Sequence, residues 1–182
     1  YDSAAWLNYH LPNWWKEAAR GRIPLAWAFN PNLDRRAPHA MHYARKHATD
    51  NDWFISGDCG AGYLNPGMLA EPRLEADLPA GWDAWVSHNL PYYKRYDLSI
   101  TGFIIDGHAP GMGQKGMDTY LRFSPDGIIG QKIPVQGLHA DTMPYIRMKT
   151  DLDGTPEQAG RRIAGMVGEM DEPRFCPIRT IL

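Results

Sequence analysis

Acidic and polar side chains follow several segments that have the composition of buried strands. Asp58 comes directly after the apolar run at 52–57, and Asp106 follows the run at 98–105. Because the carboxyl ends of parallel strands meet at one edge of a sheet, we expect side chains in these positions to converge there. The same rule selects Asn30, His108 and Asp141, the last at the end of the segment 137–141.

Two carboxyl groups at one edge could cleave a glycosidic bond. One group, protonated, donates to the leaving oxygen, while the other acts ionised as base or nucleophile, and the two lie about 5–9.5 Å apart. Neighbouring strands can supply that separation. We therefore predict Asp58 and Asp106 as the catalytic pair, with Asp141 as a third candidate. An acid after a strand is also a common helix cap, which is the structural alternative for each of them.

The loop after Asp58 contains residue types suited to binding a ligand. Gly60 and Gly62 can adopt backbone angles closed to other residues, and Pro66 stiffens the exit from the loop. Tyr63 offers a flat apolar face with a polar tip, which can stack on a sugar ring. The predicted substrate-binding residues are Asn30, Gly60, Gly62, Tyr63, Asn65 and His108.

A metal-dependent hydrolase, such as a deacetylase, is an alternative interpretation of the same residues. Asp106-Gly-His108 and His139-Ala-Asp141 each place an imidazole two residues from a carboxylate. However, the chain has no His-Glu-x-x-His motif. The histidines of the predicted exposed helix at 38–48 are explained by solvation. We predict no metal ion.

Other reactive groups and cofactors find little support in the sequence. Gly60-x-Gly62 lacks the third glycine of a dinucleotide-binding loop, and the glycine-rich segment 111–116 falls short of a phosphate loop, so we predict no cofactor. No local pattern ties Cys59 to a base, and a small residue filling a tight turn explains it.

The bulk composition limits the classes of partner. The chain has 182 residues, a net charge of -2 and a pI near 6.4. Its basic residues are scattered among acids, so nucleic acid is not an expected partner. No apolar run approaches the roughly 20 residues that span a bilayer. Cys59 and Cys176 are too few for a disulfide scaffold, and they leave both the compartment and a single bridge between them open.

Alternating helical and strand-like periodicity predicts an α/β fold with a parallel sheet, either barrel-like or open. One domain over residues 1–182 is the simplest account, but a complete β/α barrel needs about 250 residues. We therefore expect a processed or truncated piece of a longer protein. The predicted helices cover 4–20, 38–48, 82–96, 114–123 and 155–170, and the predicted strands cover 23–29, 52–57, 98–105, 127–130, 145–148 and 175–181.

The segment Gly60-Ala-Gly-Tyr-Leu-Asn-Pro66 resembles the signature of the GxGYxYP putative glycoside hydrolase family, in its C-terminal domain. Asn65 stands where the signature has its second tyrosine, which indicates a divergent member. The likeness extends through segments 21–27 and 101–107, and with them it would cover most of the chain.

This resemblance implies a β/α-barrel-like catalytic domain, usually preceded by another domain, that acts on an oligosaccharide or polysaccharide. It provides no catalytic pair that can be transferred residue by residue. A non-catalytic carbohydrate-binding or structural module is therefore an alternative to the hydrolase. Further domains of the same protein are expected partners.

Overall fold

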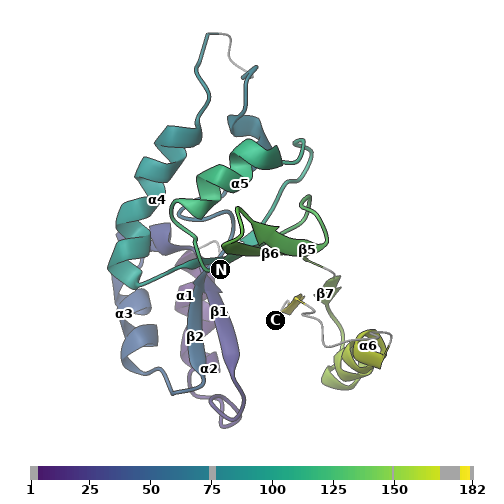
Figure 1. The fold of residues 1–182 in the computed structure, drawn as a ribbon. Helices are drawn as coiled ribbons and strands as arrows, with labels where there is room; N and C mark the ends of the chain where they lie inside the picture. The colour runs from purple at the N-terminus through teal and green to yellow at the C-terminus, as the bar shows by residue number, and fades with distance from the viewer. Residues whose placement is uncertain (1–3, 74–76, 149, 169–176, 181–182) are drawn as a thin grey trace.

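Six strands form an open sheet in the computed structural model, which describes residues 4–73, 77–148, 150–168 and 177–180 (Figure 1). In sheet order the strands are β1 (Leu25–Phe29), β2 (Asp52–Ser56), β3 (Ile100–Ile104), β4 (Gly127–Gly130), β6 (Met143–Arg147) and β5 (Gln136–His139). Every neighbouring pair is parallel except β5 with β6, which is antiparallel. The carboxyl ends of β1, β2, β3 and β4 therefore share one edge.

Helices cover one face of this sheet. They are α1 (Ala4–Tyr9), α2 (Leu11–Trp14), α3 (Pro38–Lys46), α4 (Trp82–Tyr96) and α5 (Gly113–Leu121), with 3₁₀ helices η1 (Pro31–Arg35) and η2 (Pro66–Leu69). Trp27 and Phe29 of β1 are buried in one core with residues of α1, α2 and α3. Ile104 and Ile128 belong to a second core with α4 and α5. Burial of these alternating strand residues against helices is the main stabilisation of the layer.

Buried hydroxyl groups join α4 to the strands beneath it. The Tyr93 hydroxyl lies 2.6 Å from Thr101 Oγ1, which donates to Ser124 Oγ at 2.9 Å. Ser124 Oγ in turn donates to the Gly127 carbonyl at 2.9 Å. Because a buried polar group is costly without a partner, this series of hydrogen bonds fixes the position of α4 over β3 and β4.

The opposite face of the sheet is largely uncovered in the described residues. Ala26 pairs with Trp53, and both point away from the helices because strand side chains alternate. The Trp53 side chain is 62% exposed. Further along this face, the end of the Ile55 side chain occupies the space that a side chain on Gly102 would need.

Most of the predicted elements are confirmed, including the helix at 82–96 and the strand at 127–130. Of the two predicted arrangements, the barrel-like one is not shown and the open sheet is, because β1 and β5 are the two free edges of the described sheet. The predicted all-parallel sheet is wrong for β5, which is antiparallel to β6 and was not among the predicted strands. No helix within the described ranges is long and apolar enough to cross a membrane.

A small β-α-β unit follows the main sheet. It consists of β7 (Thr150–Leu152), α6 (Pro156–Gly168) and β8 (Ile178–Thr180), and the two strands pair in parallel. The predicted start of the helix is confirmed: Thr155 Oγ1 accepts from the Gln158 main-chain N–H at 3.3 Å, and Gln158 Oε1 accepts from the Thr155 N–H at 2.9 Å. Residues 175, 176 and 181 of the predicted last strand, and 169–170 of the predicted helix, lie outside the described residues.

Candidate functional site

Asp58 lies just past the carboxyl end of β2 in a buried position. Asp58 is 5% exposed, and its backbone adopts a left-handed conformation with φ 52°. Asn30, at the end of β1, donates from Nδ2 to Asp58 Oδ2 at 2.9 Å. The Asn30 Oδ1 accepts from the Asn32 N–H at 3.0 Å, which begins η1. Asn30 is therefore an orienting partner of Asp58, and at 4% exposure it is not an open surface donor.

Asp106 lies past the end of β3, the strand next to β2, and is fully buried. Its Oδ2 accepts from the Lys132 main-chain N–H at 2.9 Å, and its own N–H donates to Gln131 Oε1 at 3.1 Å. Oδ1 has no hydrogen-bond partner among the described residues. Burial raises the pKa of the Asp106 carboxyl, although the N–H and the positive charge of Lys132 act in the opposite direction.

Cys59 holds the two acidic loops side by side. Its Sγ accepts from the Ile105 N–H at 3.3 Å and lies 3.5 Å from the Ile105 carbonyl, to which the thiol donates. Asp58 precedes one of these residues and Asp106 follows the other, so this contact brings the main chain of the two acidic loops together. Burial raises the pKa of the Cys59 thiol to about 12, and the charges of both aspartates add to this effect. The thiol stays protonated, which agrees with its predicted structural role.

Helix α4 clamps the glycine loop that follows Cys59. Asn89, fully buried, accepts at Oδ1 from the Ala61 N–H at 2.7 Å and donates from Nδ2 to the Trp85 carbonyl at 2.8 Å. His88 Nε2 donates to the Ala61 carbonyl at 2.7 Å. Both polar groups of Ala61 are thus satisfied by neighbouring residues of one helix, which fixes the path of the loop.

The loops after β2 and β3 pack directly against each other. A Cβ on Gly107 would lie 3.1 Å from the Asn65 Nδ2, and a Cβ on Gly67 would lie 1.9 Å from the Pro110 carbonyl oxygen. In these two loops, Tyr63 is 58% exposed and His108 is also exposed. The structure therefore brings Asn30, Asp58, Gly60, Gly62, Tyr63, Asn65, Asp106 and His108 to one edge of the sheet.

Asp141 does not lie at this edge, which corrects its predicted position. His139 ends β5 and Met143 begins β6, so Asp141 occupies the turn between them. Ala140 and Asp141 both have positive φ, and the Thr142 N–H donates to the His139 carbonyl at 3.1 Å, as in a tight hairpin turn. Because β6 is parallel to β4, this turn lies at the amino-terminal edge. His139 Nε2 instead contacts Asp118 Oδ1 of α5 at 2.8 Å.

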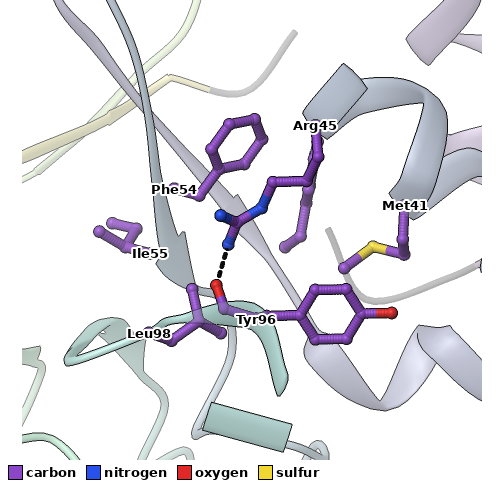
Figure 2. Close-up of a pocket in the computed structure, with 7 residues that line it drawn as sticks. Met41, Arg45, Phe54, Ile55, Tyr96 and Leu98 are labelled. Atoms are coloured by element: carbon purple, nitrogen blue, oxygen red, sulfur yellow. Dashed lines mark hydrogen bonds between the residues drawn. The ribbon is translucent and has the colours of Figure 1, made fainter. Parts of the chain in front are cut away.

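A small cavity lies away from the acidic residues, between β1, β2 and helices α3 and α4 (Figure 2). Its volume of about 230 Å³ includes open solvent, and it is lined mainly by apolar side chains. Figure 2 shows the Arg45 guanidinium pointing to the Tyr96 carbonyl oxygen, to which Nη2 donates. The same guanidinium lies 4.4 Å from the centre of the Phe54 ring. We place the candidate site at the acidic edge because this cavity has no carboxylate and is smaller than typical ligand pockets.

Metal ligands do not gather in the described part of the chain: no group of three or more His, Cys, Asp or Glu side chains is placed to hold an ion. His108 and Asp106, two residues apart in sequence, differ in exposure, since one is exposed and the other buried. Cys59 is a free thiol, and Cys176 lies outside the described residues.

A comparison with protein families finds one family that matches most of the chain. Residues 1–162 match the GxGYxYP putative glycoside hydrolase C-terminal domain. The chain belongs to this GxGYxYP family. The residues that carry the GxGYxYP signature, Gly60 to Pro66, form the loop that α4 clamps beside the two aspartates.

A solved structure has the same fold as this GxGYxYP domain. It is described as the crystal structure of a putative hydrolase from Bacteroides thetaiotaomicron, with a TM-score of 0.72 and 17% sequence identity. The match covers 91% of this chain and 32% of that one, so the chain spans about a third of the length of the solved protein. Comparison with curated protein sequences gave no match.

Four residues that shape the candidate site were not predicted from the sequence: His88, Asn89, Gln131 and Lys132. Gln131 and Lys132 directly follow the predicted strand at 127–130, so the rule that selected the aspartates would also have selected them. Asn89 interrupts the apolar stripe of the predicted helix at 82–96, which is a signal of a buried polar contact. His88 has no comparable signal, because its role depends on where the loop lies.

Proposed function

We propose that this domain is a glycoside hydrolase in which Asp58 and Asp106 form the catalytic pair. The observation that supports the pair is the Cys59–Ile105 contact, which holds the two acidic loops together on neighbouring strands. Neighbouring strands are about 5 Å apart, a spacing compatible with the carboxyl separations of glycosidases. Membership of the GxGYxYP family supports a carbohydrate substrate.

The two environments suggest different roles for the two carboxyl groups. Asp106 is buried, one of its oxygens has no partner in the described part of the chain, and its raised pKa favours the protonated form that a general acid needs. Its proton would pass to the glycosidic oxygen as the bond to the anomeric carbon breaks. Asp58 accepts a hydrogen bond from Asn30, an arrangement that stabilises a carboxylate. It would act as the nucleophile, or as the base that takes a proton from water.

Substrate binding would use residues of the two loops that carry this pair. Tyr63 has an exposed ring that could stack on the apolar face of a sugar. Asn65 and His108, from the loops after β2 and β3, would contact hydroxyl groups. Gly60 and Gly62 would contribute indirectly, because a side chain at each position would meet residues of α4. We infer that Asn30 contributes through Asp58 and not by contact with the sugar.

Replacement of each acid by its amide tests this proposal. Asp58→Asn and Asp106→Asn should each lower hydrolysis of a susceptible polysaccharide by about 10²–10⁴-fold, because each removes a proton transfer or nucleophile from the reaction. Products would be detected after incubation with a panel of polysaccharides, and circular dichroism would verify folding. Asp141→Asn is the matched control, since it removes a carboxylate at the opposite edge. Unchanged hydrolysis in a folded variant would remove that aspartate from the mechanism.

The near-complete burial of both carboxyl groups favours a second candidate, a carbohydrate-binding or structural module without catalysis. In that case the acids would serve to hold the loops and present Tyr63. This module would bind a glycan without releasing products. Its binding would be weakened by Tyr63→Ala and left intact by either Asp→Asn variant, as isothermal titration calorimetry would show.

We infer that the domain works within a larger protein. The solved structure with the same fold is about three times as long, and the described residues leave one face of the sheet here largely uncovered. The sequential order of β1 to β4 is also that of consecutive strands in a β/α barrel, so further strands could continue this arrangement.

A further inference from the structure

Lys132 makes three hydrogen bonds to the short segment that carries Asp106. Its ammonium Nζ donates to the Gly107 carbonyl at 2.8 Å and to the Ala109 carbonyl at 2.6 Å. Its main-chain N–H donates to Asp106 Oδ2 at 2.9 Å. One residue of the loop after β4 thus fixes both the acid and the backbone that follows it.

The charged and titratable groups around Asp106 come from three elements. The loop after β2 supplies Asp58 and Cys59, and α5 supplies Tyr120, whose hydroxyl donates to the Cys59 carbonyl at 2.6 Å. The loop after β4 supplies Lys132. Among these groups Lys132 alone is a cation, so its ammonium group is the one that favours the ionised form of Asp106.

We propose that Lys132 is a positioning residue for Asp106: its three hydrogen bonds hold the loop at 106–109, and they bring its positive charge to the segment that carries this acid. The structural part of this proposal stands by itself, and its catalytic consequence rests on the proposed function. The aliphatic part of the side chain would be kept by a methionine, and the charge would be kept by an arginine. These two variants therefore separate the effect of the positive charge from that of the aliphatic part of the side chain.

Titration of the Asp106 carboxyl carbon by NMR tests the proposal without a substrate. Lys132→Met should move the titration midpoint of Asp106 to higher pH, whereas Lys132→Arg should leave it close to that of the wild type. Lys94→Met, which removes an exposed lysine near the end of α4, is the control and should have no effect. An unchanged midpoint in Lys132→Met would overturn the proposal.

A second measurement covers the case in which Lys132→Met does not fold. Added salt screens an exposed ammonium group, so high ionic strength should raise the Asp106 midpoint in the wild-type protein. A midpoint that does not respond to salt, in a protein whose Lys132→Met variant is unfolded, would contradict the proposed role of the charge.

Activity then distinguishes this proposal from the proposed function. If Asp106 is the general acid, Lys132→Met should extend the alkaline limb of the pH–kcat profile to higher pH, because the acid stays protonated longer. A shifted NMR midpoint without hydrolysis by any variant would support the role of Lys132 and count against the glycosidase. A shifted NMR midpoint with an unchanged alkaline limb of the pH–kcat profile would support the role of Lys132 beside Asp106, but it would show that Asp106 is not the general acid.

Discussion

At the scale of single residues, the glycine loop depends on space as much as on hydrogen bonds. Gly60 has φ +126°, a conformation that side chains rarely adopt, and a Cβ there would lie 2.4 Å from Asn89 Oδ1. The Asn89 side chain cannot retreat without releasing the Ala61 N–H. The first glycine of the signature is therefore required by its backbone angle and by the helix beside it.

Gly60→Ala should lower the free energy of unfolding by about 3 kcal/mol, because it combines backbone strain with the loss of a buried hydrogen bond. Urea unfolding followed by tryptophan fluorescence would measure the change. Gly160→Ala is the matched control: nothing lies within 4 Å of a Cβ at this position of α6, and alanine favours a helix. Equal stability of the two variants would show that the loop is not clamped as described.

The sequence was sufficient to place Asp58 and Asp106 at one edge, because both follow strands that could be recognised from their apolar runs. It could not show that Asn30 donates to Asp58, or that one oxygen of Asp106 lacks a partner among the residues that the structure describes. Both features depend on which loops contact each other in the fold. The contact between the two acidic loops involves Cys59, and the local sequence does not specify what surrounds this residue.

At the scale of elements, Asp52 joins the start of β2 to its surroundings. Its Oδ1 accepts from Trp27 Nε1 of β1 at 2.7 Å, and its Oδ2 accepts from the Thr49 N–H at 2.7 Å and from the Arg20 guanidinium. Burial by itself would raise the pKa of this carboxyl, but the hydrogen bonds from Thr49 and Trp27 and the charge of Arg20 outweigh it, so the pKa is lowered.

This lowered pKa gives a pH-dependent stability of known sign. The stabilisation is fully present above the ordinary carboxyl pKa of 3.8 and is lost as the pH falls through the lower folded-state pKa. Asp52→Asn should lower the free energy of unfolding by about 2 kcal/mol at neutral pH, with a smaller difference from wild type in acid. Denaturant unfolding between neutral and acidic pH would measure this. A difference that stays constant with pH would mean that the ionised carboxyl is not what stabilises β1 and β2.

Elements with regular periodicity were predictable, whereas β5 was not. The helix at 82–96 has buried positions at Trp85, Val86 and Asn89 that repeat at helical spacing. By contrast, β5 is four residues long and none of its residues is buried. Its turn uses Ala140 and Asp141 at positive φ, where a glycine would have been the usual sequence signal. Asp141 was consequently assigned to the wrong edge of the sheet.

At the scale of the whole molecule, the helices form one layer over an open sheet, and α6 stands apart from it (Figure 1). No residue of α6 is buried, and Val167 is 56% exposed. Sequence periodicity could predict a parallel α/β fold, but it could not decide between an open sheet and a barrel. That choice depends on what pairs with the edge strands, and pairing across a long sequence separation leaves no local pattern.

The central claim is that one sugar substrate lies across Asp58 and Asp106 at the carboxyl edge of the sheet. The most direct measurement is a crystal structure of the Asp106→Asn variant with an oligosaccharide that the wild type cleaves. We predict the glycosidic oxygen within about 3 Å of the side chain at position 106, the anomeric carbon facing Asp58 and a sugar ring against Tyr63. A sugar bound on the uncovered face of the sheet, or elsewhere away from these residues, would contradict the account.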